Sequence, residues 1–242
     1  ARIKGDLWSF SVAGVLSAPT DVAAEPQPTG TKAKAIQVLG ADVEPPPTGV
    51  GFAGAASLNV VLDETRATVA DAGTIRAGSL TVSAENLQQQ LSLTGGAAIV
   101  APRDGRQDAV ALAGALSIND IEAVTAALVV DTHLVLTDDL VVTAHRAGNL
   151  YTFSAGMSVA TGQEGKAVAG SVSINVILNE TTADILGVTA GVGRNVEVSA
   201  RDASWIVALA GGVAVALGGK AGVGVGAGFN ILGTDERPTI TR

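Results

Sequence analysis

The chain has 242 residues, 47% of them hydrophobic but only 3% aromatic, and a formal net charge of −8. This acidic balance does not suit nucleic acid, whose phosphates attract clustered Lys and Arg, and the absence of cysteine excludes disulfides and thiolate metal sites. The most apolar stretch, residues 205–232, is interrupted by Lys220 and by many glycines. It is therefore a poor membrane helix, and we expect no membrane insertion.

Near its start the chain carries the segment "WSFSVAG" (Trp8–Gly14), which is similar to "WIVALAG" (Trp205–Gly211) further along. Residues 19–48 follow the first of these segments and hold six of the eight prolines. Proline lacks a backbone donor and resists pairing in a sheet. We therefore predict that residues 19–48 form a Pro-rich loop, inserted into a β structure and exposed on its surface.

Beyond this loop, four segments align on an asparagine: "SLNVVLDETRATV", "SINDIEAVTAALV", "SINVILNETTADI" and "GFNILGTDERPTI". The asparagines are Asn59, Asn119, Asn175 and Asn230, at spacings of 60, 56 and 55 residues. Self-similarity at this period is typical of stacked repeats. Because stacking places equivalent residues above one another, we expect the four side chains to hydrogen-bond as a structural ladder.

Apolar residues alternate with small ones inside each repeat. In "GVGVGAGFNI", Val223, Val225 and Phe229 fall on one face and glycines on the other, a period of two that is typical of β-strands. A glycine face requires the close approach of another layer. Residues at equal distances from the asparagines should also lie side by side on parallel strands. One such set is Ser83, Thr143 and Ser199, and another is Gly96, Gly156 and Gly212.

Together these patterns predict an all-β fold, a parallel β-solenoid (β-helix) of about four imperfect 55–60-residue repeats. We expect one array over residues 1–242, with the loop 19–48 at a turn of variable length. The seven aromatic residues lie in strands that flank this turn, and we expect them to pack in the core or between layers. An exposed strip that stacks on sugars is the alternative.

The repeat motif also resembles a known family. The pattern N-x3-[ND]-E-T-x-A-x-[VI], followed by "VxVSA" and an Ala/Gly/Val-rich stretch, is matched at Asn59 and Asn175, whereas the segments at Asn119 and Asn230 depart from it. It resembles the β-strand repeats of giant bacterial exoproteins, such as leukotoxin-like large repetitive proteins and filamentous-haemagglutinin-like adhesins. The resemblance covers nearly the whole chain except 19–48. It implies a β-solenoid in a secreted or surface-displayed protein, and it carries over no catalytic residue.

The sequence offers little catalytic chemistry, and we predict no catalytic, cofactor or metal residues. His133 and His145 are the two histidines, and they lack a metal-binding pattern. The acidic pairs Asp63–Glu64 and Asp138–Asp139 offer oxygen ligands for Ca²⁺ at expected turns, although the glycine-rich repeat of calcium-binding rolls is absent. The segment Asn179–Thr181 is also expected to form a turn.

We therefore expect a structural or adhesive segment of a large extracellular or cell-surface bacterial protein, acting as a stiff stalk or a self-stacking filament, and not an enzyme. Both chain ends cut through a repeat without a polar cap, so neighbouring repeats or identical chains stacked end to end are the expected partners. A host-surface or glycan receptor is a further candidate partner. Three alternatives stay open: a polysaccharide lyase or epimerase on a β-helix, an outer-membrane β-barrel, and a four-bladed propeller.

Overall fold

In a computed structural model, the structure describes residues 1–17, 49–101, 109–233 and 239–241, and these residues form strands and connecting turns without a helix. The predicted loop 19–48 lies outside the described residues. The strands are β1 (Arg2–Ile3), β2 (Asp6–Ser17), β3 (Gly49–Ala77), β4 (Leu80–Asn86), β5 (Gln89–Val100), β6 (Ala109–Leu136), β7 (Leu140–Arg146), β8 (Asn149–Thr161), β9 (Lys166–Leu186), β10 (Thr189–Val192), β11 (Val196–Asp202), β12 (Trp205–Leu217), β13 (Ala221–Leu232) and β14 (Thr239–Thr241).

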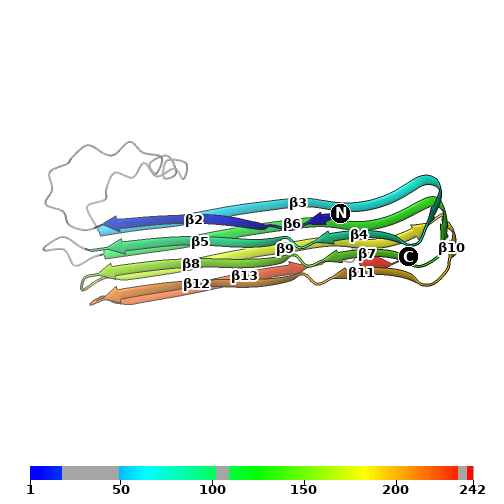
Figure 1. Cartoon of the computed structure of the whole chain (residues 1–242). Coiled ribbons are helices and arrows are strands. Elements are labelled where there is room, and N and C mark those ends of the chain that lie inside the picture. Colours follow the sequence, from blue (N-terminus) through cyan, green and yellow to red (C-terminus); the bar gives the residue numbers. More distant parts are fainter. Residues whose placement is uncertain (18–48, 102–108, 234–238, 242) are drawn as a thin grey trace, which may run out of the picture.

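These strands form three sheets in which every pair is parallel. Sheet A has the order β1-β4-β7-β11, and sheet B has the order β2-β5-β8-β12. Sheet C contains β3, β6, β9 and β13 side by side, with β10 beside β6 and β14 beside β9. Figure 1 shows sheets A and B end to end along the long strands of sheet C. The expectation of an all-β fold with parallel pairing is confirmed.

The chain passes repeatedly from sheet B to sheet C, then to sheet A and back to sheet B, and we call one such passage a circuit. Strands of successive circuits pair in register. Asn59 lies beside Asn119, Asn119 beside Asn175, and Asn175 beside Asn230. The same holds in the other two sheets, where Thr143 lies between Ser83 and Ser199, and Gly156 lies between Gly96 and Gly212.

The strands of sheet C bend where the chain turns toward sheet A. Asp71 and Asp131 have positive φ values of 51° and 46° at this bend, a conformation that aspartate tolerates better than most residues. Gly187, at a φ of 63°, lies so close to the Asp131 carboxylate that a Cβ at this position would overlap it. Asp71 and Asp131 thus mark bends within β3 and β6, which continue to Ala77 and Leu136, whereas Gly187 follows the end of β9.

The interior changes character along the molecule. We call sheet A with the part of sheet C that it faces the A half, and sheet B with its facing part of sheet C the B half. Large apolar residues fill the A half, including Leu134, Leu140 and Val142, each at most 1% exposed. The buried apolar residues of the B half are mostly alanine, and serine, threonine and asparagine lie beside them.

Small interior residues let the two sheets of the B half approach closely, as the glycine-rich face predicts. A Cβ added at Gly156 would lie 2.6 Å from the carbonyl oxygen of Gly170, in the facing sheet. A Cβ added at Gly212 would overlap the backbone of Ala169 in the same way. The B half is therefore a thin sandwich whose backbones, rather than large side chains, determine the spacing of the sheets.

Candidate interaction surface

The four recurrent asparagines form one continuous column inside the B half. The Nδ2 atom of Asn59 donates to Oδ1 of Asn119 (2.6 Å), Asn119 donates to Asn175 (2.7 Å), and Asn175 donates to Asn230 (2.8 Å). Asn119 and Asn175 are fully buried. Each of the two inner amides uses one donor and one acceptor along the column, so the ladder has a direction.

The ladder is also bonded to the facing sheet. Asn119 donates to the Thr152 hydroxyl (3.2 Å), which in turn donates to Oδ1 of Asn175 (2.9 Å). In the first circuit, Asn59 donates to the Ser92 hydroxyl (3.2 Å). Buried amides need such partners, because an unpaired polar group in the interior costs about 1–3 kcal/mol. The ladder thus replaces a hydrophobic core at the centre of the B half.

The two ends of the ladder are complementary to each other. Because each asparagine donates to the next circuit, Oδ1 of Asn59 is the terminal acceptor, and Nδ2 of Asn230 is the terminal donor. The inner asparagines are buried, whereas Asn59 is half-buried and Asn230 is exposed. An amide can be placed against either end and continue the same series of hydrogen bonds.

Large apolar side chains of the B half point outward from sheet B. On the outer face of sheet B these side chains form five rows that run across the four strands, and we name each row by its residue in β2. The rows are Trp8, Leu91, Tyr151 and Val207; Phe10, Leu93, Phe153 and Leu209; Val12, Gly95, Ala155 and Gly211; Gly14, Ala97, Met157 and Val213; and Leu16, Ile99, Val159 and Val215.

None of these twenty residues is charged, and several are strongly exposed. Trp8 is 65% exposed, Phe10 is 59% exposed and Leu209 is 63% exposed. Single exposed apolar residues are ordinary, but a continuous apolar face marks a site of interaction. We call these five rows the B face.

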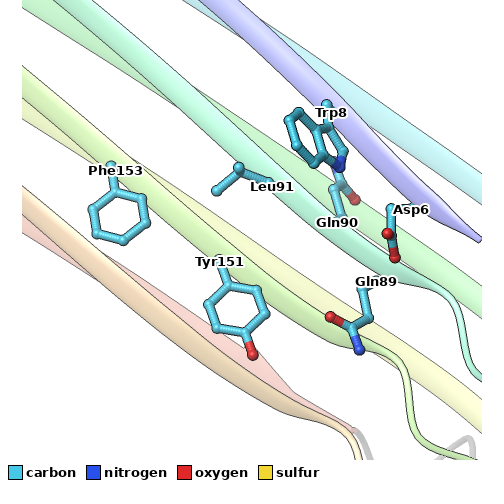
Figure 2. A pocket seen from close by; sticks show the side chains of 7 residues that line it. All are labelled: Asp6, Trp8, Gln89, Gln90, Leu91, Tyr151 and Phe153. Carbon is cyan, nitrogen blue, oxygen red and sulfur yellow. The ribbon is translucent and has the colours of Figure 1, made fainter.

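A shallow pocket of about 310 Å³ lies at one end of the B face. Figure 2 shows the rings of Trp8, Tyr151 and Phe153 around Leu91, with Asp6 and Gln89 at the polar margin. Trp205, next to this margin, makes an edge-to-face contact with Tyr151 at a centroid distance of 4.9 Å. Most of the pocket lining is therefore apolar, with polar groups on one side, as in ordinary ligand and side-chain pockets.

The aromatic residues do not lie where the sequence analysis placed them. We expected them in the core or between layers, but Trp8, Phe10, Phe52 and Phe229 are each at least 59% exposed on outer faces. The expectation is wrong because the close approach of the glycine-rich faces excludes rings from the interior. These aromatic side chains therefore belong to the outer surface.

Sheet C has a second apolar outer face, but charges interrupt it. Phe52, Leu58 and Val225 are exposed there. In the strand order, Asp120 lies between Val60 and Val176, and Glu122 follows two residues later on the same face. The outer face of sheet C therefore carries carboxylates within its apolar area, unlike the B face.

A buried ion pair occupies the junction of the two halves. Arg146 is 1% exposed, and its Nη1 atom lies 3.6 Å from Oδ2 of Asp63. Asn86 also donates to Asp63, and Asn179 donates to Asp202 (2.8 Å). Burial lowers the pKa of the Arg146 guanidinium, and the negative charges of Asp63 and Asp202 act against this shift. Sequence reasoning did not identify this cluster.

The acidic pairs considered for Ca²⁺ lie in different settings. Asp63 and Glu64 are not in a turn but inside β3, where successive side chains point to opposite faces. Asp63 faces Arg146, whereas Glu64 points outward to Arg66. Asp138 pairs with Arg194 (3.3 Å), and Asp139 accepts two hydrogen bonds from Asn195. Among the described residues, no group of three or more His, Asp or Glu side chains is placed to hold a metal ion.

Two other sequence expectations have a structural outcome. The segment Asn179–Thr181 is not a turn, because it lies within the strand β9. His133 is exposed and His145 is half-buried, and they belong to different strands, β6 and β7. These positions therefore do not bring the two histidines together as a catalytic pair.

Comparison with known proteins gives no relative. No protein-family model, curated protein or solved structure matches this chain. The described residues also contain no helix that is long and apolar enough to cross a membrane.

Proposed function

We propose that this chain is a structural repeat segment, a β-solenoid that stacks end to end on its neighbours to form a stiff stalk or filament. The neighbours are further repeats of the same polypeptide or other copies of the chain. The likeness of its repeat motif to giant bacterial exoproteins supports a place on the cell surface or outside the cell, with an adhesive role. The observation that carries the proposal is the directional asparagine ladder.

Complementary ladder ends favour stacking from head to tail. When a second copy is placed against the last circuit of the first, Nδ2 of Asn230 in the first copy meets Oδ1 of Asn59 in the second copy. The ladder then continues with the geometry that already joins Asn119 to Asn175. A reversed copy would instead bring two donors or two acceptors together, which leaves buried polar groups unpaired. The ladder thus selects one direction of stacking.

The backbone supports the same arrangement. Within the described part of the chain, sheets B and C end at β2 and β3 on one side and at β12 and β13 on the other. Edge strands present unpaired N–H and C=O groups that pair readily with another strand. These edges are 12 residues or longer, so each junction offers many parallel ladder hydrogen bonds. Our proposal assigns no catalytic function to these edge strands.

An Asn230→Asp variant tests the proposal at one atom. Aspartate keeps the oxygen that accepts from Asn175, so the fold of the chain itself is preserved. It replaces the terminal donor with a second acceptor, which would face Oδ1 of Asn59 in the next copy. We expect an end-to-end association constant roughly 5- to 150-fold lower, because an unpaired buried acceptor costs about 1–3 kcal/mol.

The measurement is rod length, by sedimentation velocity and electron microscopy over a range of protein concentrations. Four strands per sheet make one chain about 19 Å thick along the stack, so rods should lengthen in steps of about 19 Å. Gln163→Glu, which adds the same charge to an exposed turn, is the matched control and should leave rod length unchanged. A wild-type chain that shows no elongation, or an Asn230→Asp variant that elongates equally well, would contradict the proposal.

A further inference from the structure

The B face requires a partner that end-to-end stacking does not supply. Stacking covers strand edges, whereas the B face lies on the side of the stack and continues from one circuit to the next. We propose that the B face binds the B face of a second copy, so that two stacks pack side by side. The two copies are related by a two-fold axis that runs along the stacking direction.

Charge and hydrogen bonding together select a second copy as the occupant. The chain carries a net charge of −8, yet the B face carries none, so two copies meet there without opposed carboxylates. The outer face of sheet C would instead bring Asp120 and Glu122 of two copies together. For a chain that is not stacked, a lipid bilayer is disfavoured, because hydrocarbon leaves the backbone groups of edge strands such as β2 and β12 unpaired at a cost of several kcal/mol each.

The order of the rows makes the B face complementary to itself. Bulky side chains occupy the Trp8 and Phe10 rows, and glycine and alanine fill the Val12 row beyond Val12 itself. The Gly14 row begins with Gly14 and Ala97 and ends with Met157 and Val213. A two-fold axis above the Val12 row reverses the strand direction in the second copy. It places each Phe10 row against the partner's Gly14 row, so that bulky residues meet small ones at β2 and β5, and apolar side chains meet one another at β8 and β12.

The same axis explains the pocket beside Trp8. It places the Trp8 row against the partner's Leu16 row, in which Ile99 is 37% exposed. Ile99 of one copy then faces Leu91 of the other, at the centre of the pocket between Trp8 and Tyr151. The pocket is thus filled by a side chain of the second copy, as at the centre of well-packed protein interfaces.

The size of the B face connects side-by-side packing to stacking. Five rows over four strands cover about 30 Å by 19 Å, so that a pair of single chains buries roughly 1,200 Å². This is the lower end of the range for specific interfaces. The buried area grows in proportion to the number of stacked copies, and the axis keeps both ladders pointing the same way. Side-by-side packing should therefore be weak for single chains and strong for stacks.

Charge complementation tests the arrangement residue by residue. The axis places Leu209 of one copy against Val213 of the other, both in β12 and both exposed. Leu209→Glu alone and Val213→Lys alone should each raise the dissociation constant for side-by-side pairing at least tenfold, because each buries an unpaired charge. An equimolar mixture of the two variants should regain pairing, since each interface then contains Glu opposite Lys.

Val225→Glu is the matched control, because Val225 is 59% exposed on the last circuit but points outward from sheet C. Pairing is measured by sedimentation equilibrium and by the width of rods in electron micrographs, with circular dichroism as the check on folding. Asn230→Asp should shorten rods, and those rods that still contain several stacked copies should keep the paired width, which separates this inference from the stacking proposal. The inference is overturned if the mixture stays unpaired, if Val225→Glu disrupts pairing equally, or if unpaired wild-type chains float with phosphatidylcholine vesicles while Leu209→Glu chains do not.

Discussion

The two halves of the molecule solve the same packing problem in opposite ways. In the A half, Leu134 and Leu140 are buried, and outward residues of sheet A such as Thr143 and Glu197 are polar. In the B half, Asn119 and mostly small residues are buried beside a few larger ones such as Leu150, and many large apolar side chains point outward. Both halves use strands with the same period of two. Alternation along a strand therefore predicts two faces, but it does not decide which of them is the core.

This difference changes what stabilises each half. The A half gains free energy by removing large apolar side chains from water, at about 25 cal/mol per Å² of buried apolar surface. The B half does so to a smaller extent, through Leu150 against Ile121 and Ile177, because close backbones and hydrogen-bonded amides occupy much of its interior. Its large apolar side chains remain available for burial against another surface. The A half thus keeps most of its large apolar side chains inside, whereas the B half exposes many of its own on the B face.

The largest expected effect lies at the junction of the halves. Replacing Arg146 with methionine leaves Asp63 and Asp202 without their cation in a buried site. We expect the free energy of unfolding to fall by about 3–5 kcal/mol, the usual result of breaking a buried ion pair from one side. Chemical denaturation monitored by circular dichroism measures this change.

A compensating variant makes the test specific. Combining Arg146→Met with Asp63→Asn and Asp202→Asn removes the unpaired charges, and most of the lost stability should return. Arg66→Met is the control, because Arg66 pairs with Glu64 on the outer surface, where an ion pair contributes at most about 1 kcal/mol. Equal effects of Arg146→Met and Arg66→Met would show that the junction cluster does not hold the halves together.

A second prediction compares one leucine from each half. Leu134 is fully buried in the A half, so Leu134→Ala should lower the free energy of unfolding by about 2–5 kcal/mol through lost burial and a cavity. Leu209 is exposed on the B face, so Leu209→Ala should change it by roughly 0.5 kcal/mol or less in a dilute, unpaired chain. The comparison fails if both substitutions have similar effects on denaturation midpoints at low protein concentration.

The sequence predicted the parallel register because stacked circuits repeat residues of the same kind. Asn119 and Gly156 have neighbours of identical type in both adjoining circuits. The junction cluster could not be predicted in this way. Arg146 lies between Asn86 and Asp202, so its column contains three different residue types, and aligning the repeats hides their shared role.

The aromatic residues show a second limit of sequence reasoning. Trp8 and Phe10 alternate with small residues, which is equally compatible with rings inside and rings outside. Only the approach of the two sheets decides between these arrangements, and that approach depends on glycines of strands far apart in the sequence, such as Gly156 and Gly170. The rule that aromatic residues are usually buried therefore gave the wrong face.

The smallest expected effect tests this close approach with two matched glycines. A Cβ at Gly156 would lie 2.6 Å from the oxygen and 2.8 Å from the nitrogen of Gly170, whereas a Cβ at Gly114 meets nothing within 4 Å. Neither glycine is among those with positive φ, so the two substitutions differ in available space rather than in backbone strain. Gly156→Ala should destabilise the fold by about 1–3 kcal/mol, because backbone atoms cannot move aside as a flexible side chain can. Gly114→Ala should instead stabilise it by about 0.4–1 kcal/mol, since alanine restricts the unfolded chain. Urea denaturation of the two variants resolves the opposite signs, and two changes of the same sign would show that the sheets of the B half are not in close contact.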